Sequence, residues 1–334
     1  MTAWTRPLAA TAAAVALILS GCSTPSTAPS AGPAVASEGA TSYPLTVSNC
    51  GVDVVFDGPP ERVVLLETAP VTILDGLGVL DRVVSVAGTF DPDYYSPDLA
   101  QRIGAIEKLS EDIDASGHLM ISAEVVFAQE PDLVLGLPGG LTREGLLDGG
   151  ANTLIQPVYC PTGVGETSFE SLYDQVKAYG QIFDRNAEAQ RVVDDLTSRV
   201  AAVTAATSGA PERTAAVLYP SVGGGPLYAY GRASMAQPQL EAAGFTNVFD
   251  DTAERVFEVS IEELIGRDPE VLILLYQGDQ DGVLAEVTSL PGSDAIRAID
   301  NGDVIVQLFN FTEPPTPLSV AGLERIVERL PAQS

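Results

Sequence analysis

Two stretches of this chain, residues 121–137 and 259–275, share one sequence pattern. In each, a small polar residue precedes a glutamate, and apolar residues then recur at helical spacing. Both continue through an Asp/Glu-Pro-Asp/Glu turn into a run of apolar, strand-forming residues. A helix that leads into a buried strand, found twice, indicates an architectural repeat. We therefore expect two similar α/β lobes.

Strands and helices alternate on both sides of one long helical stretch, residues 168–207. Such alternation is typical of parallel sheets with helical crossovers, so each lobe should be Rossmann-like. Tyr179 to Asp184 should interrupt the long stretch, and a helix from Asn186 to about Ala206 would span roughly 30 Å. The predicted divisions are an N-terminal lobe at 45–167, a helical linker with a rigid bridging helix at 168–207, and a C-terminal lobe at 208–334.

Residues 1–21 have the character of an export signal. Arg6 precedes an almost purely apolar run from Leu8 to Ser20, which is too short for a membrane span of roughly 20 residues. LSGC, ending at Cys22, resembles the bacterial lipobox, in which the cysteine is lipidated and becomes the first residue of the mature protein. The alternative is an ordinary secretory signal with an incidental cysteine.

Residues 22–44 are rich in Ser, Thr, Pro, Ala and Gly and lack apolar periodicity, which predicts a flexible tether. With lipid on Cys22, the tether would let a folded domain stand off from the membrane. We therefore expect an extracytoplasmic lipoprotein, anchored to the outer face of the cell membrane by its N-terminal lipid.

The chain is strongly acidic, with a formal net charge of −28 at pH 7. This charge excludes non-specific nucleic-acid binding, which needs Lys and Arg against phosphate. It suits solubility outside the cell. It also means that an anionic ligand would need local Arg or Lys side chains to offset the general field.

The remaining cysteines and the single histidine limit the covalent and metal chemistry. Cys50 and Cys160 are an even pair in an exported chain, so a disulfide is the default expectation, with two free buried thiols as the alternative. His118 is the one histidine, and a transition-metal site normally needs several nitrogen or thiolate ligands. We therefore expect no metal site made by protein side chains alone.

The order and spacing of five stretches resemble the siderophore- and cobalamin-type substrate-binding proteins of ABC importers. They are the two repeated stretches, together with APVTILDGLGVLDRVVSVAG at 69–88, EAAGFTNVFDD at 241–251 and LPGSDAIRAIDNGDVIVQL at 290–308. NCG at 49–51, with a later cysteine, looks like an actinobacterial branch of that group. The resemblance implies the class III periplasmic-binding-protein fold, in which a ligand cleft lies between two lobes joined by a rigid helix.

The resemblance also implies partners. The family delivers its ligand to an ABC permease and its ATPase, and it docks through one glutamate from each lobe. Carried over residue by residue, these positions are Glu124 and Glu262, although each could instead be a helix-start acid favoured by the helix dipole. Thr72 is a departure, because the family often has an acidic residue at this cleft-facing position. We expect a monomer that needs no catalytic cofactor.

Ligand contacts should come from loops at the carboxyl ends of strands, including Glu67 and Thr68. Aromatic side chains there would give broad apolar contact, and arginines would bind carboxylate or phosphate. His118 could bind haem together with Tyr228 or Tyr230, as one His and one Tyr do in haem-binding members; otherwise it is a surface residue. The expected ligand-binding residues are Tyr94, Tyr95, Arg143, Tyr228, Tyr230, Arg232, Tyr276 and Phe309.

The leading hypothesis is a solute-binding lipoprotein that captures an iron-siderophore or similar metal chelate. The alternative within this class is a carrier of another large anionic cofactor, such as cobalamin, haem or a deazaflavin precursor. An extracellular enzyme is disfavoured because no Ser-His-Asp set, nucleophile elbow or phosphate loop is present. A structural or adhesive lipoprotein without a ligand is the third class.

Overall fold

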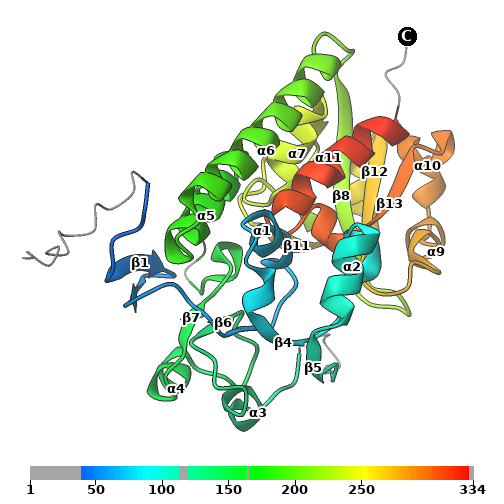
Figure 1. The fold of residues 1–334 in the computed structure, drawn as a ribbon. Helices are drawn as coiled ribbons and strands as arrows, with labels where there is room; N and C mark the ends of the chain where they lie inside the picture. The colour runs from blue at the N-terminus through cyan, green and yellow to red at the C-terminus, as the bar shows by residue number, and fades with distance from the viewer. Residues whose placement is uncertain (1–38, 113–118, 162, 164, 331–334) are drawn as a thin grey trace, which may run out of the picture. The chain divides into compact units, whose positions relative to one another are not determined.

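The computed structural model describes residues 39–112, 119–161, 163 and 165–330 (Figure 1). Its first element is an antiparallel hairpin of β1 (Leu45–Asn49) and β2 (Val52–Phe56). Ahead of the hairpin, the Tyr43 hydroxyl donates to Ile182 O at 2.8 Å and Thr41 N donates to Asp184 Oδ1 at 2.7 Å. The last residues of the predicted tether are thus bonded to the helical linker.

The N-terminal lobe is built on a five-stranded parallel sheet in the order β5-β4-β3-β6-β7. The central strand, β3, is buried along its whole length, as expected where helices cover both faces of a sheet. The last strand, β7, ends at Leu154, and Pro157 begins a short 3-10 helix soon after it. The strands are β3 (Val63–Leu65), β4 (Val83–Ala87), β5 (Glu107–Ser110), β6 (Leu133–Leu135) and β7 (Asn152–Leu154).

Short helices connect these strands, and several begin at a polar cap. Ser96 Oγ accepts from Leu99 N at 3.3 Å, and Thr142 Oγ1 accepts from Gly145 N at 3.1 Å. The helical elements of this lobe are α1 (Val71–Gly76), η1 (Leu80–Arg82), η2 (Pro92–Tyr94), α2 (Pro97–Gly104), α3 (Ala123–Phe127), α4 (Arg143–Asp148) and η3 (Pro157–Tyr159).

The C-terminal lobe has a six-stranded sheet in the order β11-β9-β8-β12-β13, with β10 also paired to β8. β8, β12 and β13 are parallel, as the sequence predicts. β9 and β11 join antiparallel, so this sheet is mixed. The strands are β8 (Arg213–Pro220), β9 (Leu227–Tyr230), β10 (Phe245–Asn247), β11 (Val256–Val259), β12 (Val271–Tyr276) and β13 (Val304–Leu308).

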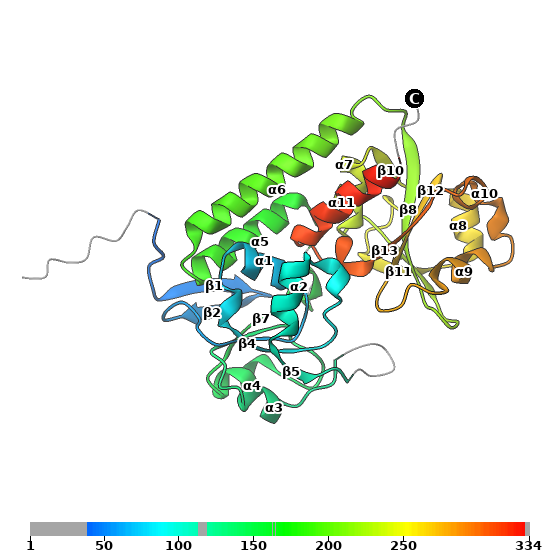
Figure 2. The same cartoon turned by 45° about the vertical axis from the view of Figure 1, so that its right-hand side comes forward.

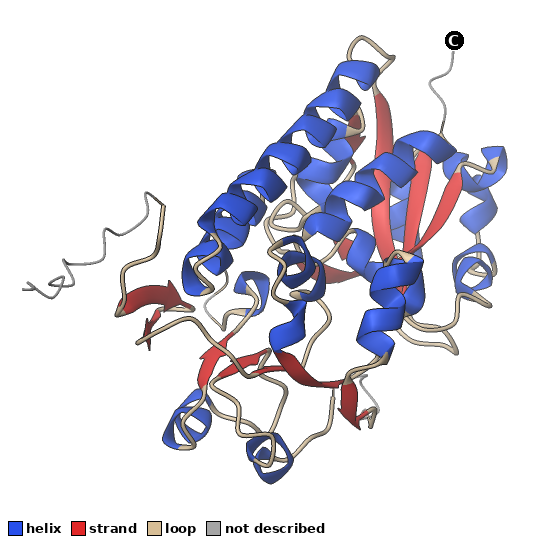
Figure 3. Ribbon diagram, viewed as in Figure 1, coloured by secondary structure: helices blue, strands red, loops and turns tan. Residues whose placement is uncertain are grey.

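Helices cover the faces of this second sheet (Figure 3). α11 starts with a capping box in which Thr316 and Ser319 satisfy each other's backbone N–H groups. The helical elements of this lobe are α7 (Ala236–Ala242), α8 (Ile261–Arg267), α9 (Val283–Thr288), η4 (Ser293–Ala295), α10 (Arg297–Asn301), η5 (Phe309–Phe311) and α11 (Pro317–Arg329).

The linker consists of two helices, α5 (Phe169–Ile182) and α6 (Asn186–Thr207), broken where the sequence predicts. α6 has 22 residues, which corresponds to about 33 Å. Val193 and Leu196 belong to the core of the N-terminal lobe, whereas Val203 packs on a core of the C-terminal lobe. Figure 2 shows α5, α6 and α11 lying side by side. The prediction of two α/β lobes joined by a long helix is confirmed.

None of the helices in the described ranges combines the length and the apolar character that crossing a membrane requires.

Candidate functional site

The two lobes meet through loops that follow their strands. Asn310, after β13, donates from its backbone N to Tyr94 Oη at 3.1 Å and from its Nδ2 to Thr68 Oγ1 at 3.2 Å. Gln156, after β7, donates from Nε2 to Pro315 O at 3.2 Å. Loops at the carboxyl ends of the two sheets therefore contact each other, which is where ligands bind in open α/β folds.

Three of the predicted ligand-binding tyrosines come together at this contact. Tyr94, Tyr95 and Tyr276 share one apolar cluster with residues of β13, η5 and α11. The Tyr94 ring centroid lies 5.4 Å from that of Phe311 and 6.0 Å from that of Tyr95. The Tyr95 hydroxyl is buried and has no hydrogen-bond partner among the described residues. Tyr94 joins the lobes, and Tyr95 keeps an unused polar atom beside it.

A second aromatic group lies on the C-terminal sheet. Tyr228 on β9 pairs with Tyr219 on β8, so their side chains share one face with Tyr230. Phe309 packs edge-on against Tyr219, with ring centroids 5.9 Å apart. Tyr230 is buried, whereas Tyr228 and Phe309 remain partly exposed. The structure thus keeps three predicted ligand residues of this lobe on or beside one aromatic face.

Arg255, just before β11, connects this face to the N-terminal lobe. Its Nη1 donates to Glu313 Oε2 at 3.2 Å, and its guanidinium carbon lies 5.6 Å from the ring centroid of Tyr159 in η3. Glu313 is fully buried, and its Oε1 also accepts from Met235 N at 2.8 Å. Burial raises the pKa of the Glu313 carboxyl, and the guanidinium and the N–H offset part of that rise.

Glu67 follows β3, at the centre of the N-terminal sheet. Its side chain is half-buried and runs along Gly136, where an added Cβ would lie 3.1 Å from Glu67 Cγ. Burial raises the pKa of the Glu67 carboxyl to about 8. Charge on Glu67 in turn raises the pKa of Tyr179, in addition to the larger effect of that residue's own burial. No hydrogen bond or ion pair to Glu67 is found within the described ranges.

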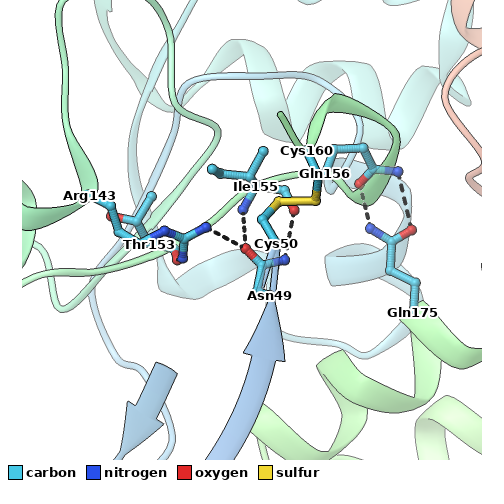
Figure 4. The surroundings of a disulfide bond; sticks show 8 residues. All are labelled: Asn49, Cys50, Arg143, Thr153, Ile155, Gln156, Cys160 and Gln175. Carbon is cyan, nitrogen blue, oxygen red and sulfur yellow. Dashed lines mark hydrogen bonds between the residues drawn. A yellow bond between two sulfur atoms is a disulfide. The ribbon is translucent and has the colours of Figure 1, made fainter. Parts of the chain in front are cut away.

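Arg143 lies beside the disulfide (Figure 4). Its Nη1 donates to Thr153 O at 2.5 Å and its Nη2 donates to Asn49 Oδ1 at 2.8 Å. These contacts hold β7 to the hairpin, and the guanidinium is therefore occupied by protein. The structure does not bring Arg143 together with the aromatic residues described above.

The disulfide joins Cys50 to Cys160 across a sequence separation of 110, which confirms the expected pairing. Asn49 supports the same junction, because its Oδ1 accepts from Ile155 N at 2.9 Å and its Nδ2 donates to Ile155 O at 2.8 Å. The hairpin therefore fixes the segment from Ile155 to Cys160, which carries Gln156 (Figure 4).

Arg232 also has a protein partner. Its Nε lies 3.0 Å from Glu166 Oε1, and both side chains are well exposed, at 48% and 72%. Thr167, which follows Glu166, donates from Oγ1 to Ala233 O at 2.7 Å. The Arg232–Glu166 pair therefore lies at a second contact between the lobes. The pair is a surface contact, and Arg232 is more exposed than Arg255, whose side chain is 26% exposed.

The two predicted docking glutamates occupy matching places. Glu124 and Glu262 are each the second residue of a helix, α3 and α8, and each follows a serine cap position by two. Both are exposed. Hydrogen bonds from the Ser122 side chain and from the residue's own backbone N–H lower the pKa of the Glu124 carboxyl, which is thus ionised near neutral pH.

Sequence analysis did not select Tyr159, Arg255 or Glu313. Tyr159 carries one usable signal, its place directly before a disulfide cysteine. Arg255 and Glu313 lie in irregular loops, where no periodicity distinguishes a buried residue from a solvated one. The Cys22 and His118 predictions fall outside the described residues.

Within the described ranges, no group of three or more His, Cys, Asp or Glu side chains could hold a metal ion. Two surface hollows, of about 590 and 580 Å³, lie elsewhere. One is beside Asp75 and Arg102, and the other is beside Arg213 and Phe245; neither is lined from both lobes. The candidate ligand site is therefore argued from the contacts between the lobes and not from either hollow.

The model of the periplasmic binding protein family matches residues 63–307 of the sequence. A crystal structure described as an ABC-type Fe³⁺-hydroxamate transport system, from Saccharomonospora viridis, superposes with a TM-score of 0.82 and 57% identity. The superposition covers 87% of this chain and 100% of the S. viridis chain.

More distant relatives share the same extent. A cobalamin-binding protein of Halobacterium salinarum is 26% identical over 297 residues, 86% of this chain and 74% of that protein. A periplasmic binding protein from Veillonella parvula superposes with a TM-score of 0.71 at 18% identity, covering 86% of this chain and 97% of that one, and so supports the fold alone.

Proposed function

Because this chain belongs to the periplasmic binding protein family, we propose that it captures a ferric hydroxamate siderophore or a similar chelate for an ABC importer. The observation that carries the proposal is the 57% identity, over the whole of that chain, to the protein of the S. viridis Fe³⁺-hydroxamate transport system. The metal would arrive inside its chelator, so the protein itself needs no metal ligands. The family binds substrates, and we propose that this chain performs no catalysis.

The contact between the lobes supplies the chemistry that such a ligand requires. Tyr95, Tyr228, Tyr276 and Phe309 remain partly exposed there, and rings of this kind cover the apolar arms of a chelate. Arg255, whose side chain is 26% exposed, supplies a cationic contact. In this proposal Arg143 and Arg232 support structure, because protein groups already occupy them.

Isothermal titration of the purified protein tests this assignment. We expect saturable binding of a ferric trihydroxamate and weaker binding of the iron-free chelator, because iron organises the hydroxamate arms into one compact shape. Cyanocobalamin and haem are the comparison ligands. Preferred binding of cyanocobalamin would favour the second candidate, which rests on the Halobacterium salinarum relative. Conversion of the ligand during titration would contradict a pure carrier.

We propose that Glu124 and Glu262 pair with basic residues of the permease, one from each lobe. The double variant Glu124→Lys/Glu262→Lys should keep chelate affinity and lose uptake into cells. Glu144→Lys is a matched control, because Glu144 is also an exposed acid in the first turn of a helix. Loss of uptake in the control as well would attribute the effect to net charge and reject the docking role.

We propose that lipid on Cys22 anchors the protein to the outer face of the membrane and that it acts as a monomer. Cys22→Ser should move the protein from the membrane fraction to the medium. Unchanged membrane fractionation of this variant would reject the anchor without affecting the ligand proposal.

A further inference from the structure

We propose that Glu67 forms a subsite for a protonated amino group on the ligand, so that the preferred chelate is cationic. This inference rests on the proposed function and specifies its ligand class. It depends on the place of Glu67 in the sheet, the lack of a partner for its carboxylate, and the balance of charge around it.

The fold places Glu67 at the contact between the lobes. It follows the central strand of the N-terminal sheet, and the next residue, Thr68, accepts a hydrogen bond from Asn310 of the other lobe. Leu66 N donates to Leu135 O at 2.8 Å, so the backbone here is still held in the sheet. Gly136 leaves room for the Glu67 side chain to pass along the neighbouring strand. The carboxylate is thus delivered to the site by rigid elements and not by a free loop.

The carboxylate has no partner in the described part of the chain, although its residue stays partly accessible. An acid that is only half-buried and unpaired can receive a group from outside. A carboxylate that protein partly covers and that lacks a cation is costly to ionise, and this burial raises the pKa of Glu67 to about 8. A ligand ammonium would remove that cost by supplying the missing charge.

None of the neighbouring groups described below supplies a cation to the Glu67 carboxylate. The titratable groups that sense Glu67 are Tyr159 of η3, which is 40% exposed, and buried Tyr179 of α5. Both have raised pKa values and are neutral at pH 7. The cation facing Tyr159 is Arg255, which is already bound to buried Glu313. This pair adds no net charge. The formal charge of −28 on the whole chain also attracts cations and repels anions.

Two ferric chelates with one iron-binding core separate this inference from the proposed function. The ferric complex of desferrioxamine B is a linear trihydroxamate with one free terminal amine, and its N-acetylated form lacks only that charge. A charge-assisted hydrogen bond should favour the amine form by about 10- to 100-fold. Titration in buffers of different ionisation enthalpy should show release of close to one proton per chelate at pH 7, and none with the acetylated form.

Glu67→Gln should abolish both the preference and the proton release while keeping the affinity for the acetylated chelate. Glu144→Gln, which changes an exposed acid on α4, should leave both unchanged. Equal affinity of the wild-type protein for the two chelates, or a preference that survives Glu67→Gln, overturns this inference and leaves the proposed function intact. If neither chelate binds the wild-type protein, both fail. The proton count of the wild-type protein decides the question even if the variant does not fold.

Discussion

Glu313 and Glu67 are acidic residues near the contact between the lobes, one from each lobe, and they differ in burial and in protein partners. Glu313 of the C-terminal lobe is fully buried and is met by a guanidinium and a backbone N–H. Glu67 of the N-terminal lobe is half-buried and has no partner in the described ranges. A buried carboxylate whose hydrogen-bond and ion-pair partners all come from the protein helps to specify the fold. A carboxylate without such partners leaves a polar group that a ligand can pair with. The comparison therefore separates a structural acid from the acid that we propose to bind ligand.

The largest expected effect is at Glu313. Glu313→Ala should lower the free energy of unfolding by about 3–5 kcal/mol, because Arg255 keeps its charge in a mostly buried place and Met235 N loses its acceptor. Urea denaturation of the purified protein measures the change. Glu324→Ala is the matched control, since its partner Arg199 is a third exposed, and its effect should be about 1 kcal/mol or less. Equal losses at the two sites would remove the distinction between the acids.

The second test concerns Glu67 and pH. Its pKa rises from an ordinary value of 4.5 to about 8 on folding, so folding takes up a proton between these values. Stability should therefore fall as pH rises from 4.5 to 8, by about 1–2 kcal/mol after allowance for partial exposure. Glu67→Gln should lose this pH dependence and be the more stable protein at pH 8. Thermal melts of both proteins at a series of pH values would show parallel curves if Glu67 were paired.

The smallest expected effect is on the stability of two tyrosine variants. The hydroxyl of Tyr94 has a hydrogen-bond partner, and that of Tyr95 has none among the described residues. Tyr94→Phe removes the acceptor of Asn310 N and should cost about 1 kcal/mol. Tyr95→Phe removes a buried hydroxyl that has no partner among the described residues, and should leave stability unchanged or slightly higher. Denaturation midpoints of the two variants measure this difference. A larger loss at Tyr95 than at Tyr94 would show that the Tyr95 hydroxyl is bonded in the folded protein.

The fold followed from features that act locally along the chain. The twice-repeated helix and strand, and the helical spacing of residues 168–207, are set by periodicity and need no knowledge of distant partners. The antiparallel strands β9 and β11 were not foreseen, because such short strands depend on pairing that only the folded chain provides. The cysteine pair was foreseen because parity in an exported chain is informative by itself.

The ligand-binding role of the selected residues stays a prediction, and the arginines show what the sequence alone does not settle. Arg143 and Arg232 follow predicted strands or lie in a tyrosine-rich loop, but Asn49 and Glu166 occupy them. Arg255 has no such sequence signal and is the cation that reaches buried Glu313 and Tyr159. Which partner binds a guanidinium is decided by tertiary contacts between residues far apart in the chain. The tyrosines were selected for their size and their polar tip, and their part in ligand binding stays a prediction.

The bridging helix has a consequence for how the molecule comes apart. Val200 of α6 packs against hydrophobic residues of both lobes, as does Phe169 of α5. Cutting the chain near residue 207 would expose apolar residues of α5 and α6 on one fragment. The other fragment would lose the helices that cover its hydrophobic core. Calorimetry should accordingly record a single melting transition, and neither half should be recoverable alone as a well-folded fragment.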